Sequence, residues 1–267
     1  MPMISTTTAN KQAITRTVTS SVRSHIDELV ARAGESLYPA GVPDNVDLRA
    51  FFLSLADSLD RDFHALAAAD REVARELGED QQARTLRDTR AAELRESLFR
   101  VRSLVNAAFS QAATTGLGIG GRIPTRAESM IPFARNVAEK LAALETPATV
   151  PGFMQIDLAA AARDLATRAQ ALDDALTELA RDIRETQAVQ SQHSTANDTW
   201  QRHYGPIARM IEGCFLVAGM DHQAARVRPT ARRNAGQPEE TDLETPADAD
   251  NDTSADSEAP ATSAAAS

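Results

Sequence analysis

A heptad pattern through residues 151–220 constrains the fold more than any other feature of this chain. Its leucines recur every seven residues, at Leu158, Leu165, Leu172 and Leu179. Other apolar residues lie between them in alternating steps of four and three, at Ala162, Ala169, Leu176 and Ile183. Tyr204 and Ile211 keep the same phase further on. The pattern places one apolar stripe on one face of an α-helix and predicts a long helix packed along a partner helix, as in a coiled coil.

An earlier copy of this pattern lies 106 residues upstream. The matching residues are Leu59 and Leu165, Leu66 and Leu172, Val73 and Leu179, Leu77 and Ile183, Leu98 and Tyr204, Val101 and Ile207, Val105 and Ile211, and Phe109 and Phe215. A Pro-Ala-x-Val-Pro turn at 39–43 also recurs at 147–151, and Pro124-Thr125 recurs as Pro229-Thr230. We therefore predict an internal repeat of two duplicated units, each made of a short helix, this turn and a long helical segment.

Composition supports an all-α fold class, which we picture as an elongated helical bundle. Only 4% of the residues are aromatic, and no stretch alternates between apolar and polar residues as a β-strand does. The predicted organisation is a flexible N-terminus at 1–10, repeat unit 1 at 11–123, repeat unit 2 at 124–233 and a disordered acidic tail at 234–267. The start of the chain does not resemble a secretory signal, and no run of 18 residues is apolar, so we expect a cytoplasmic protein.

The helix boundaries follow from turn and capping residues. We expect a first helix at 11–37, ended by the turn at 39–43, and a second helix capped by Asp44 or Asn45. Thr125 with Glu128 predicts a capping box that opens a helix at 126–145.

The sequence leaves open whether each long segment is one helix or a hairpin. The unbroken apolar phase and the absence of proline between Pro43 and Pro124 favour continuous helices. The polar middle of each segment, around Gly78 in the first, favours a hairpin.

The net charge of −10 comes mostly from the C-terminus. Residues 234–267 contain nine acidic residues and no Lys or Arg, which leaves 29 acidic and 28 basic residues in the rest of the chain. The nearly neutral body gives no electrostatic reason to expect a nucleic-acid partner. The tail contains too few apolar residues to fold on its own.

Two groups of arginines are candidate interaction residues. Arg122 and Arg126 follow a glycine-rich stretch at 116–121, which fits an anion site less well than a loop between helices, because no strand precedes it. The apolar residues of that stretch could instead form a tip that contacts a partner or lipid: Leu117, Ile119 and Ile123. The second group is Arg226, Arg228, Arg232 and Arg233, which we expect either to contact the acidic tail or to bind phosphate.

No constellation of an enzyme stands out. A ferritin-like di-iron site needs Glu three residues before His, and none of the five histidines has an acidic residue there. Cys214 lies among apolar residues and is expected to be a buried structural thiol, so we predict no catalytic residue, metal or cofactor. The favoured function is a non-enzymatic scaffold or adaptor that self-associates and binds protein partners. The alternative is a membrane-acting protein that uses the tip at 116–123.

Overall fold

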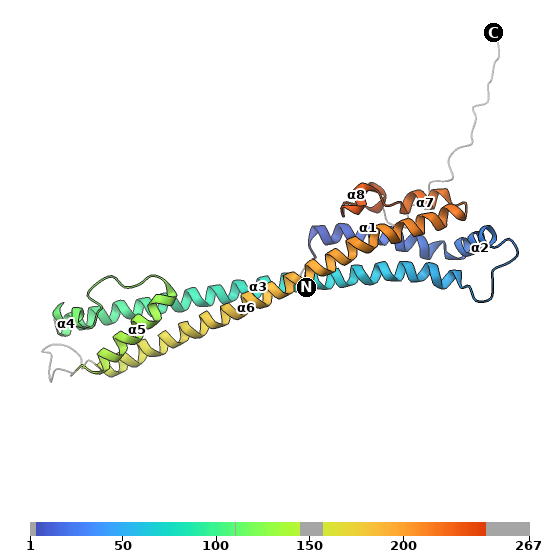
Figure 1. Ribbon diagram of the computed structural model, residues 1–267. Coiled ribbons are helices and arrows are strands. Elements are labelled where there is room, and N and C mark those ends of the chain that lie inside the picture. The colour runs from blue at the N-terminus through green and yellow to red at the C-terminus, as the bar shows by residue number, and fades with distance from the viewer. Residues whose placement is uncertain (1–3, 110, 145–156, 244–267) are drawn as a thin grey trace, which may run out of the picture. The chain divides into compact units, whose positions relative to one another are not determined.

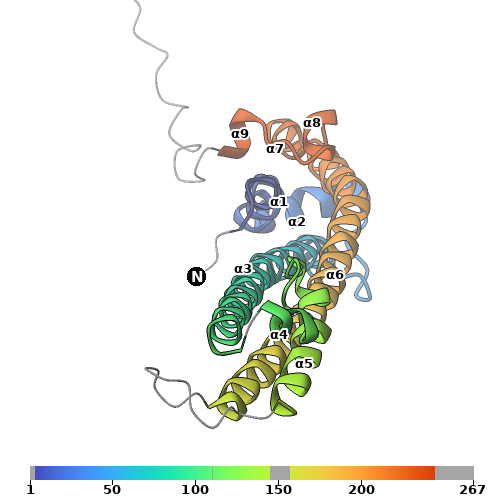
Figure 2. The same ribbon diagram turned by 90° about the vertical axis from the view of Figure 1, so that its left-hand side faces the viewer.

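The structure, a computed structural model, describes residues 4–109, 111–144 and 157–243, and within them it contains helices and no strand. The all-α prediction is confirmed. The helices, labelled in Figures 1 and 2, are α1 (Thr6–Ser24), α2 (Ile26–Leu37), α3 (Leu48–Ala108), α4 (Gln111–Gly116), α5 (Ala127–Ala142), α6 (Leu158–Val217), α7 (Asp221–Val227), α8 (Ala231–Asn234) and α9 (Glu240–Leu243).

Two of these helices are far longer than the rest. α3 has 61 residues and α6 has 60, and neither folds back into a hairpin. The preference for continuous helices is therefore confirmed. Their apolar stripes bury one face along much of the length, and this packing stabilises helices that propensity alone would leave marginal.

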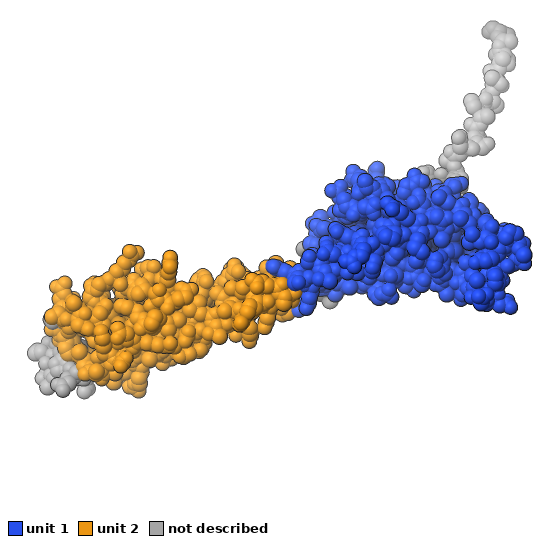
Figure 3. Space-filling view, in the orientation of Figure 1, with its two compact units in different colours: residues 1–72, 190–267 blue, residues 73–189 orange. Residues whose placement is uncertain are grey.

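The chain forms two compact units, shown in Figure 3. Unit 1 comprises residues 1–72 and 190–267, and unit 2 comprises residues 73–189. Both α3 and α6 pass from one unit into the other, so each unit contains one end of each long helix. The shorter helices divide between the units, with α1, α2 and α7–α9 in unit 1 and α4 and α5 in unit 2.

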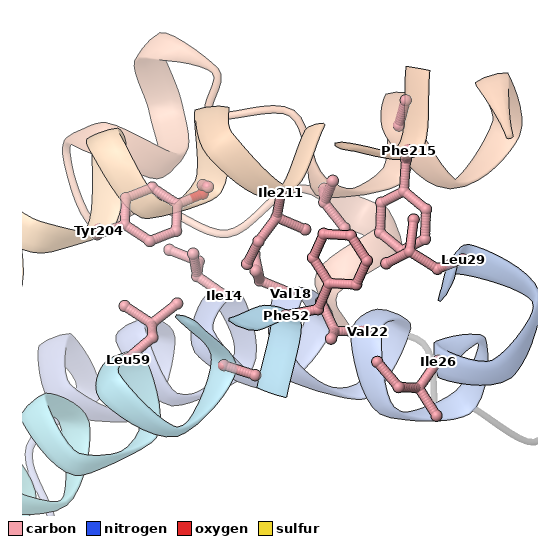
Figure 4. Packing of buried hydrophobic residues seen from close by; sticks show 14 of the residues in the cluster. Ile14, Val18, Val22, Ile26, Leu29, Phe52, Leu59, Tyr204, Ile211 and Phe215 are labelled. Atoms are coloured by element: carbon pink, nitrogen blue, oxygen red, sulfur yellow. The ribbon is translucent and has the colours of Figure 1, made fainter. Parts of the chain in front are cut away.

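The core of unit 1 is built from residues of α1, α2, α3, α6 and α7, some of which Figure 4 shows. Its fully or almost fully buried members include Ile14, Val18 and Val22 from α1, Leu29 from α2, Phe52 and Leu59 from α3, and Tyr204, Ile211 and Phe215 from α6. These residues follow the predicted stripes of their helices. Each large apolar side chain removed from water in this way contributes about 1.5–3 kcal/mol before the entropy of ordering is subtracted.

The core of unit 2 contains the leucine heptad. Leu165 and Leu172 are fully buried and pack with apolar residues from α3 and α5. The partners include Leu94, Leu98 and Val105 from α3, and Met130, Ala134 and Val137 from α5. Both ribbon views show α5 lying beside α6 (Figures 1 and 2). The heptad residues Leu158, Leu165 and Leu172 therefore form part of an internal core.

The predicted stripe is wrong near the middle of α3. Leu77 was expected to be buried but its side chain is exposed, whereas Glu76, Asp80 and Ala83 are buried. Neither apolar cluster reaches this stretch, because one ends on α3 at Ala67 and the other begins at Ala91.

The helix expected at 11–37 is two helices that meet at His25. The His25 ring donates a hydrogen bond from Nδ1 to the carbonyl oxygen of Ser21, at 3.2 Å, and so competes with the helical backbone there. α1 begins at Thr6, earlier than expected, because the Ser5 hydroxyl accepts a hydrogen bond from the Thr8 amide at 3.3 Å.

Two predicted caps are also wrong. α3 is capped by Asp47, whose carboxylate accepts a hydrogen bond from the Ala50 amide at 2.8 Å. α5 begins after Arg126, and no side chain caps it, so the capping box at Thr125 does not form. Pro132 is the sixth residue of α5, so its missing amide removes one helical hydrogen bond, the one to the Glu128 carbonyl.

The predicted tail starts too early. Residues 234–243 belong to unit 1 and include α9, with Asp242 buried. The remainder of that tail, at 244–267, and the second Pro-Ala-x-Val-Pro turn, at 147–151, lie outside the described residues.

Candidate functional site

The glycine-rich stretch forms a loop between α4 and α5. Several backbone amides of this loop donate hydrogen bonds to carbonyl oxygens of α4. Gly118 has a φ of 82°, which favours glycine, and its amide bonds to the Thr115 carbonyl at 3.0 Å. The amides of Ile119 and Gly120 both bond to the Thr114 carbonyl, at 3.0 and 2.9 Å. These donors are already used, so they cannot cradle an anion.

Arg102 of α3 closes this loop from the other side. Its guanidinium donates to the carbonyl oxygens of Gly120 and Gly121, at 3.0 and 3.2 Å. A polar cavity of about 330 Å³ lies beside it, lined by Arg102, Ser103, Asn106, Gln111, Thr114 and Gly120. The only positively charged side chain in the lining of this cavity, Arg102, is therefore already hydrogen-bonded to the backbone of the loop.

The apolar residues of the loop do not form an exposed tip. Leu117, Ile119 and Ile123 are all buried in the core of unit 2. The side chains that the membrane-acting alternative would place in lipid therefore pack inside unit 2. Within the described ranges, no helix combines the length and the apolar character needed to cross a bilayer.

The six candidate arginines fall into different units. Arg122 and Arg126 belong to unit 2, where both are exposed. The other four belong to unit 1 and differ strongly in environment. The arginines therefore do not make one site within a unit.

Arg233 is a buried structural residue. Its side chain is 2% exposed, and its guanidinium pairs with Asp242, whose side chain is fully buried, at 2.8 and 2.9 Å. It also donates to the carbonyl oxygens of Arg226 and Arg228, at 2.7 and 2.9 Å, and to the Thr241 hydroxyl at 3.0 Å. All five N–H groups of the guanidinium are thus used. The prediction that these arginines contact the tail is confirmed for Arg233.

The other arginines of this group lie around that pair. Arg228 is exposed and pairs with Glu212 of α6 at 2.7 Å, and Arg232 donates to the Pro238 carbonyl at 3.4 Å. Arg226 is half-buried. Arg228 and Arg233 are therefore committed to carboxylates of the protein itself, whereas the buried Nε of Arg226 has no hydrogen-bond partner among the described residues.

A second polar cluster, which the sequence did not reveal, lies between α1 and α6. Lys11 is buried, hydrogen-bonds to Asn197, and places its ammonium 4.9 Å from the centre of the Trp200 ring. Trp200 donates to the Thr15 hydroxyl at 3.0 Å and stacks on Tyr204 with ring centres 5.1 Å apart. Burial lowers the pKa of Lys11 and raises the pKa of the Tyr204 hydroxyl. The cluster tightens the packing of unit 1.

The C-terminal segment covers this cluster. α9 packs against α1, and a side chain placed at Gly236 would meet the Lys11 Cε atom at 2.9 Å. The Tyr204 hydroxyl is buried and lacks a hydrogen-bond partner among the described residues. Sequence patterns could not have predicted this packing, because it joins residues almost the whole chain apart.

Two histidines of α6 face aspartates of α3 within unit 1. His203 Nδ1 lies 2.7 Å from Asp62, and His193 Nε2 lies 3.3 Å from Asp70. Asp70 also accepts hydrogen bonds from the Ser5 amide and hydroxyl, at 2.6 and 3.0 Å, so it serves to hold the start of α1. Among the described residues, no three His, Cys, Asp or Glu side chains are grouped as metal ligands.

Cys214 is half-buried rather than buried, and it packs against the core of unit 1. Burial raises the pKa of its thiol, which disfavours the nucleophilic thiolate.

An apolar pocket of about 460 Å³ lies at the end of α2. It is lined by Val30, Ala31, Gly34, Glu35, Tyr38, Pro39, Gly41 and Val42. The first Pro-Ala-x-Val-Pro turn forms one wall of this pocket.

Comparison of the chain with protein-family models, with curated proteins and with solved structures found no match.

Proposed function

We propose that this chain is a non-enzymatic helical scaffold or adaptor that acts in the cytoplasm through protein–protein contacts and self-associates. The observation that carries the proposal is that α3 and α6 each run unbroken through two units, and each unit has its own apolar core. Both long helices also carry large apolar side chains that the cores leave exposed, among them Phe51 and Phe99 on α3 and Met210 and Leu216 on α6. Helix faces of this kind are what coiled-coil and bundle proteins use to bind other helices.

We also propose that the chain arose by duplication and forms a helical bundle, with repeats at 11–123 and 124–233. The burial of equivalent residues supports this. Leu59 and Leu165 are both fully buried, whereas Leu77 and Ile183, also 106 residues apart, are both exposed. The two units are composed alike, since each joins the first part of one long helix to the last part of the other.

Light scattering coupled to size exclusion, with the full chain at several concentrations, tests the self-association. If the chain self-associates, the measured mass should be at least twice the 28.7 kDa of one chain. A monomer at every concentration would contradict it. Native mass spectrometry of the same sample tests the non-enzymatic role, because a stoichiometric nucleotide, metal or cofactor would argue for a catalytic or carrier function instead.

A further inference from the structure

One face of unit 1 carries two exposed or half-buried stripes, one on α3 and one on α6, and each stripe is apolar toward one end and polar toward the other. On α3 the stripe is Phe51, Leu55, Ser58 and Asp62, in steps of four, three and four. On α6 it is His203, Ile207, Met210, Cys214 and Val217, in steps of four, three, four and three. These steps keep each stripe on one side of its helix. The hydrogen bond between Asp62 and His203 joins the two stripes at one end, and together we call them the α3–α6 seam of unit 1.

The seam is separate from the faces that the shorter helices occupy. α1 lies on another side of α3, where Arg23 pairs with Asp57 and Asp60 at 2.8 and 2.7 Å. The segment after α6 lies on the other side of that helix, where Arg228 meets Glu212. Neither side belongs to the seam, because these residues lie about half a turn away from the stripes.

Large apolar side chains of the seam remain in water. Phe51, Met210 and Val217 are 42%, 45% and 43% exposed, although each belongs to a helix that packs well elsewhere. Leu55, Ile207 and Cys214 lie partly buried against the core of unit 1 and form the floor of the seam. Single exposed apolar residues are ordinary, but a run of them aligned on two helices is typical of an interaction site.

Arginines border the seam on both outer edges. Arg61 lies beyond the α3 stripe, and Arg202 and Arg209 lie beyond the α6 stripe. All three are exposed, and none of their guanidiniums pairs with a carboxylate among the described residues. The only carboxylate within the stripes, Asp62, is bonded to His203. The edges therefore carry free positive charge on either side of an apolar strip.

We propose that this seam binds an amphipathic helix of another protein, whose apolar face covers the strip and whose flanks carry Asp and Glu. The inference rests on the proposed adaptor function and names the chemistry of its partner. Charge complementarity selects this occupant, since acidic flanks would pair with arginines on both edges. The chain's own residues after Leu243 supply acidic charge but no large apolar side chain, so they cannot fill the strip.

A labelled synthetic helical peptide tests the proposal against the full chain by fluorescence anisotropy. The peptide carries Leu at helical spacings of three and four and Glu on both flanks, and a second peptide replaces every Glu with Lys. The acidic peptide binds, more weakly at high salt, and the Lys peptide does not. Met210→Glu and the pair Arg202→Glu with Arg209→Glu each lower the affinity at least about tenfold. Phe99→Glu is the matched control, because Phe99 is 44% exposed but belongs to unit 2, and it changes affinity by less than about twofold.

Several results would overturn the proposal. Equal binding of the two peptides, no binding of the acidic one, or equal effects of Met210→Glu and Phe99→Glu would each do so. Two further measurements test whether something else binds the seam. Sedimentation velocity tests for a second copy of the chain, and binding to vesicles of anionic phosphatidylglycerol tests for a membrane surface. If Met210→Glu dissociates an oligomer, the seam binds a second copy, and the adaptor function stands while this proposal fails. If Met210→Glu abolishes vesicle binding, the seam is a membrane surface, and both proposals fail.

Discussion

The same pair of helices presents two different faces in the two units. In each unit a side-chain hydrogen bond of 2.7 Å joins α3 to α6: Asp62 to His203 in unit 1, and Ser97 to Asp164 in unit 2. Beside the bond in unit 1 lie exposed apolar side chains and unpaired arginines. Beside the bond in unit 2, Arg168 pairs with Asp164 at 2.8 Å and approaches Glu93 at 3.8 Å, so the charges are matched within the chain.

The face of unit 2 has ion pairs that are already formed within the chain, whereas the face of unit 1 has exposed apolar side chains and unpaired arginines. We call the first face closed and the second open. A face whose ions already have partners gains little from a new protein, whereas an apolar strip with free cations at its edges gains both area and charge pairing. The units differ in their shorter helices, but both bury one face of α3 and one face of α6, so the exposed face of this helix pair can be compared between them. If this comparison is right, each unit loses stability independently of the other, and only unit 1 binds a partner on this face.

The largest effect should come from breaking the buried ion pair of unit 1. Asp242→Ala leaves Arg233 charged and buried, which should destabilise unit 1 by about 3–5 kcal/mol. Hydrogen exchange should show lost protection in α1 and α7–α9 and unchanged protection in α5. Arg228→Ala, which removes an exposed pair with Glu212, is the control and should cost less than about 1 kcal/mol. Equal loss of protection in both units would contradict their independence.

A matched pair of core substitutions compares the two units directly. Leu66→Ala in unit 1 and Leu172→Ala in unit 2 each empty an almost fully buried site and should cost about 2–5 kcal/mol. Hydrogen exchange with mass spectrometry should place each loss in the unit that holds the residue. If either substitution lowers protection equally throughout the chain, the units unfold as one and the division is wrong.

The ion-paired face of unit 2 should respond to acid. Partial burial alone would raise the pKa of Asp164, but hydrogen bonds from Arg168 and Ser97 outweigh it and lower that pKa. A lowered folded-state pKa stabilises the fold above the ordinary Asp value, and this stabilisation is lost as pH falls through the folded-state value. Asp164→Asn should therefore reduce the acid dependence of unit 2 stability, with a loss below about 1 kcal/mol at neutral pH because the pair is exposed. An unchanged acid titration of the variant would show that Asp164 does not contribute.

The smallest effect on stability should come from the seam itself. Phe51→Glu and Met210→Glu change exposed side chains that the fold does not use, so each should alter the free energy of unfolding by less than about 0.5 kcal/mol. Chemical denaturation followed by circular dichroism measures this. A loss of 2 kcal/mol or more, about the size of a core deletion, would mean that the seam belongs to the core of unit 1.

Much of the fold could be predicted from periodicity. The stripes that place Val18, Leu59 and Leu165 in cores were visible because helical spacing depends only on local sequence. The split at His25 and the cap at Asp47 were missed because they depend on single side-chain hydrogen bonds. The polar stretch at Glu76 and Asp80 was missed because an apolar pattern was assumed to continue.

The site was harder to predict than the fold. The pairing of Arg233 with Asp242 was expected only as a general contact with the tail, since charge alone does not indicate which residues become buried. The seam did leave a signal, because Ile207, Met210, Cys214 and Val217 form a second stripe beside the core stripe of Tyr204 on α6. That signal gains meaning only from the structure, in which Met210 and Val217 are 45% and 43% exposed.

The most direct test of the open and closed faces is the alkylation rate of one cysteine on each. Cys214, the only cysteine of the chain, lies on the seam of unit 1. The double variant Cys214→Ser with Leu104→Cys moves the thiol to the corresponding face of unit 2, one heptad from Ser97. Rates are measured with iodoacetamide at alkaline pH, because burial raises the pKa of Cys214. The acidic peptide should slow alkylation at Cys214 and leave the rate of the Leu104→Cys variant unchanged. Protection of both positions, or of neither, would contradict the claim that unit 1 alone carries an open binding face.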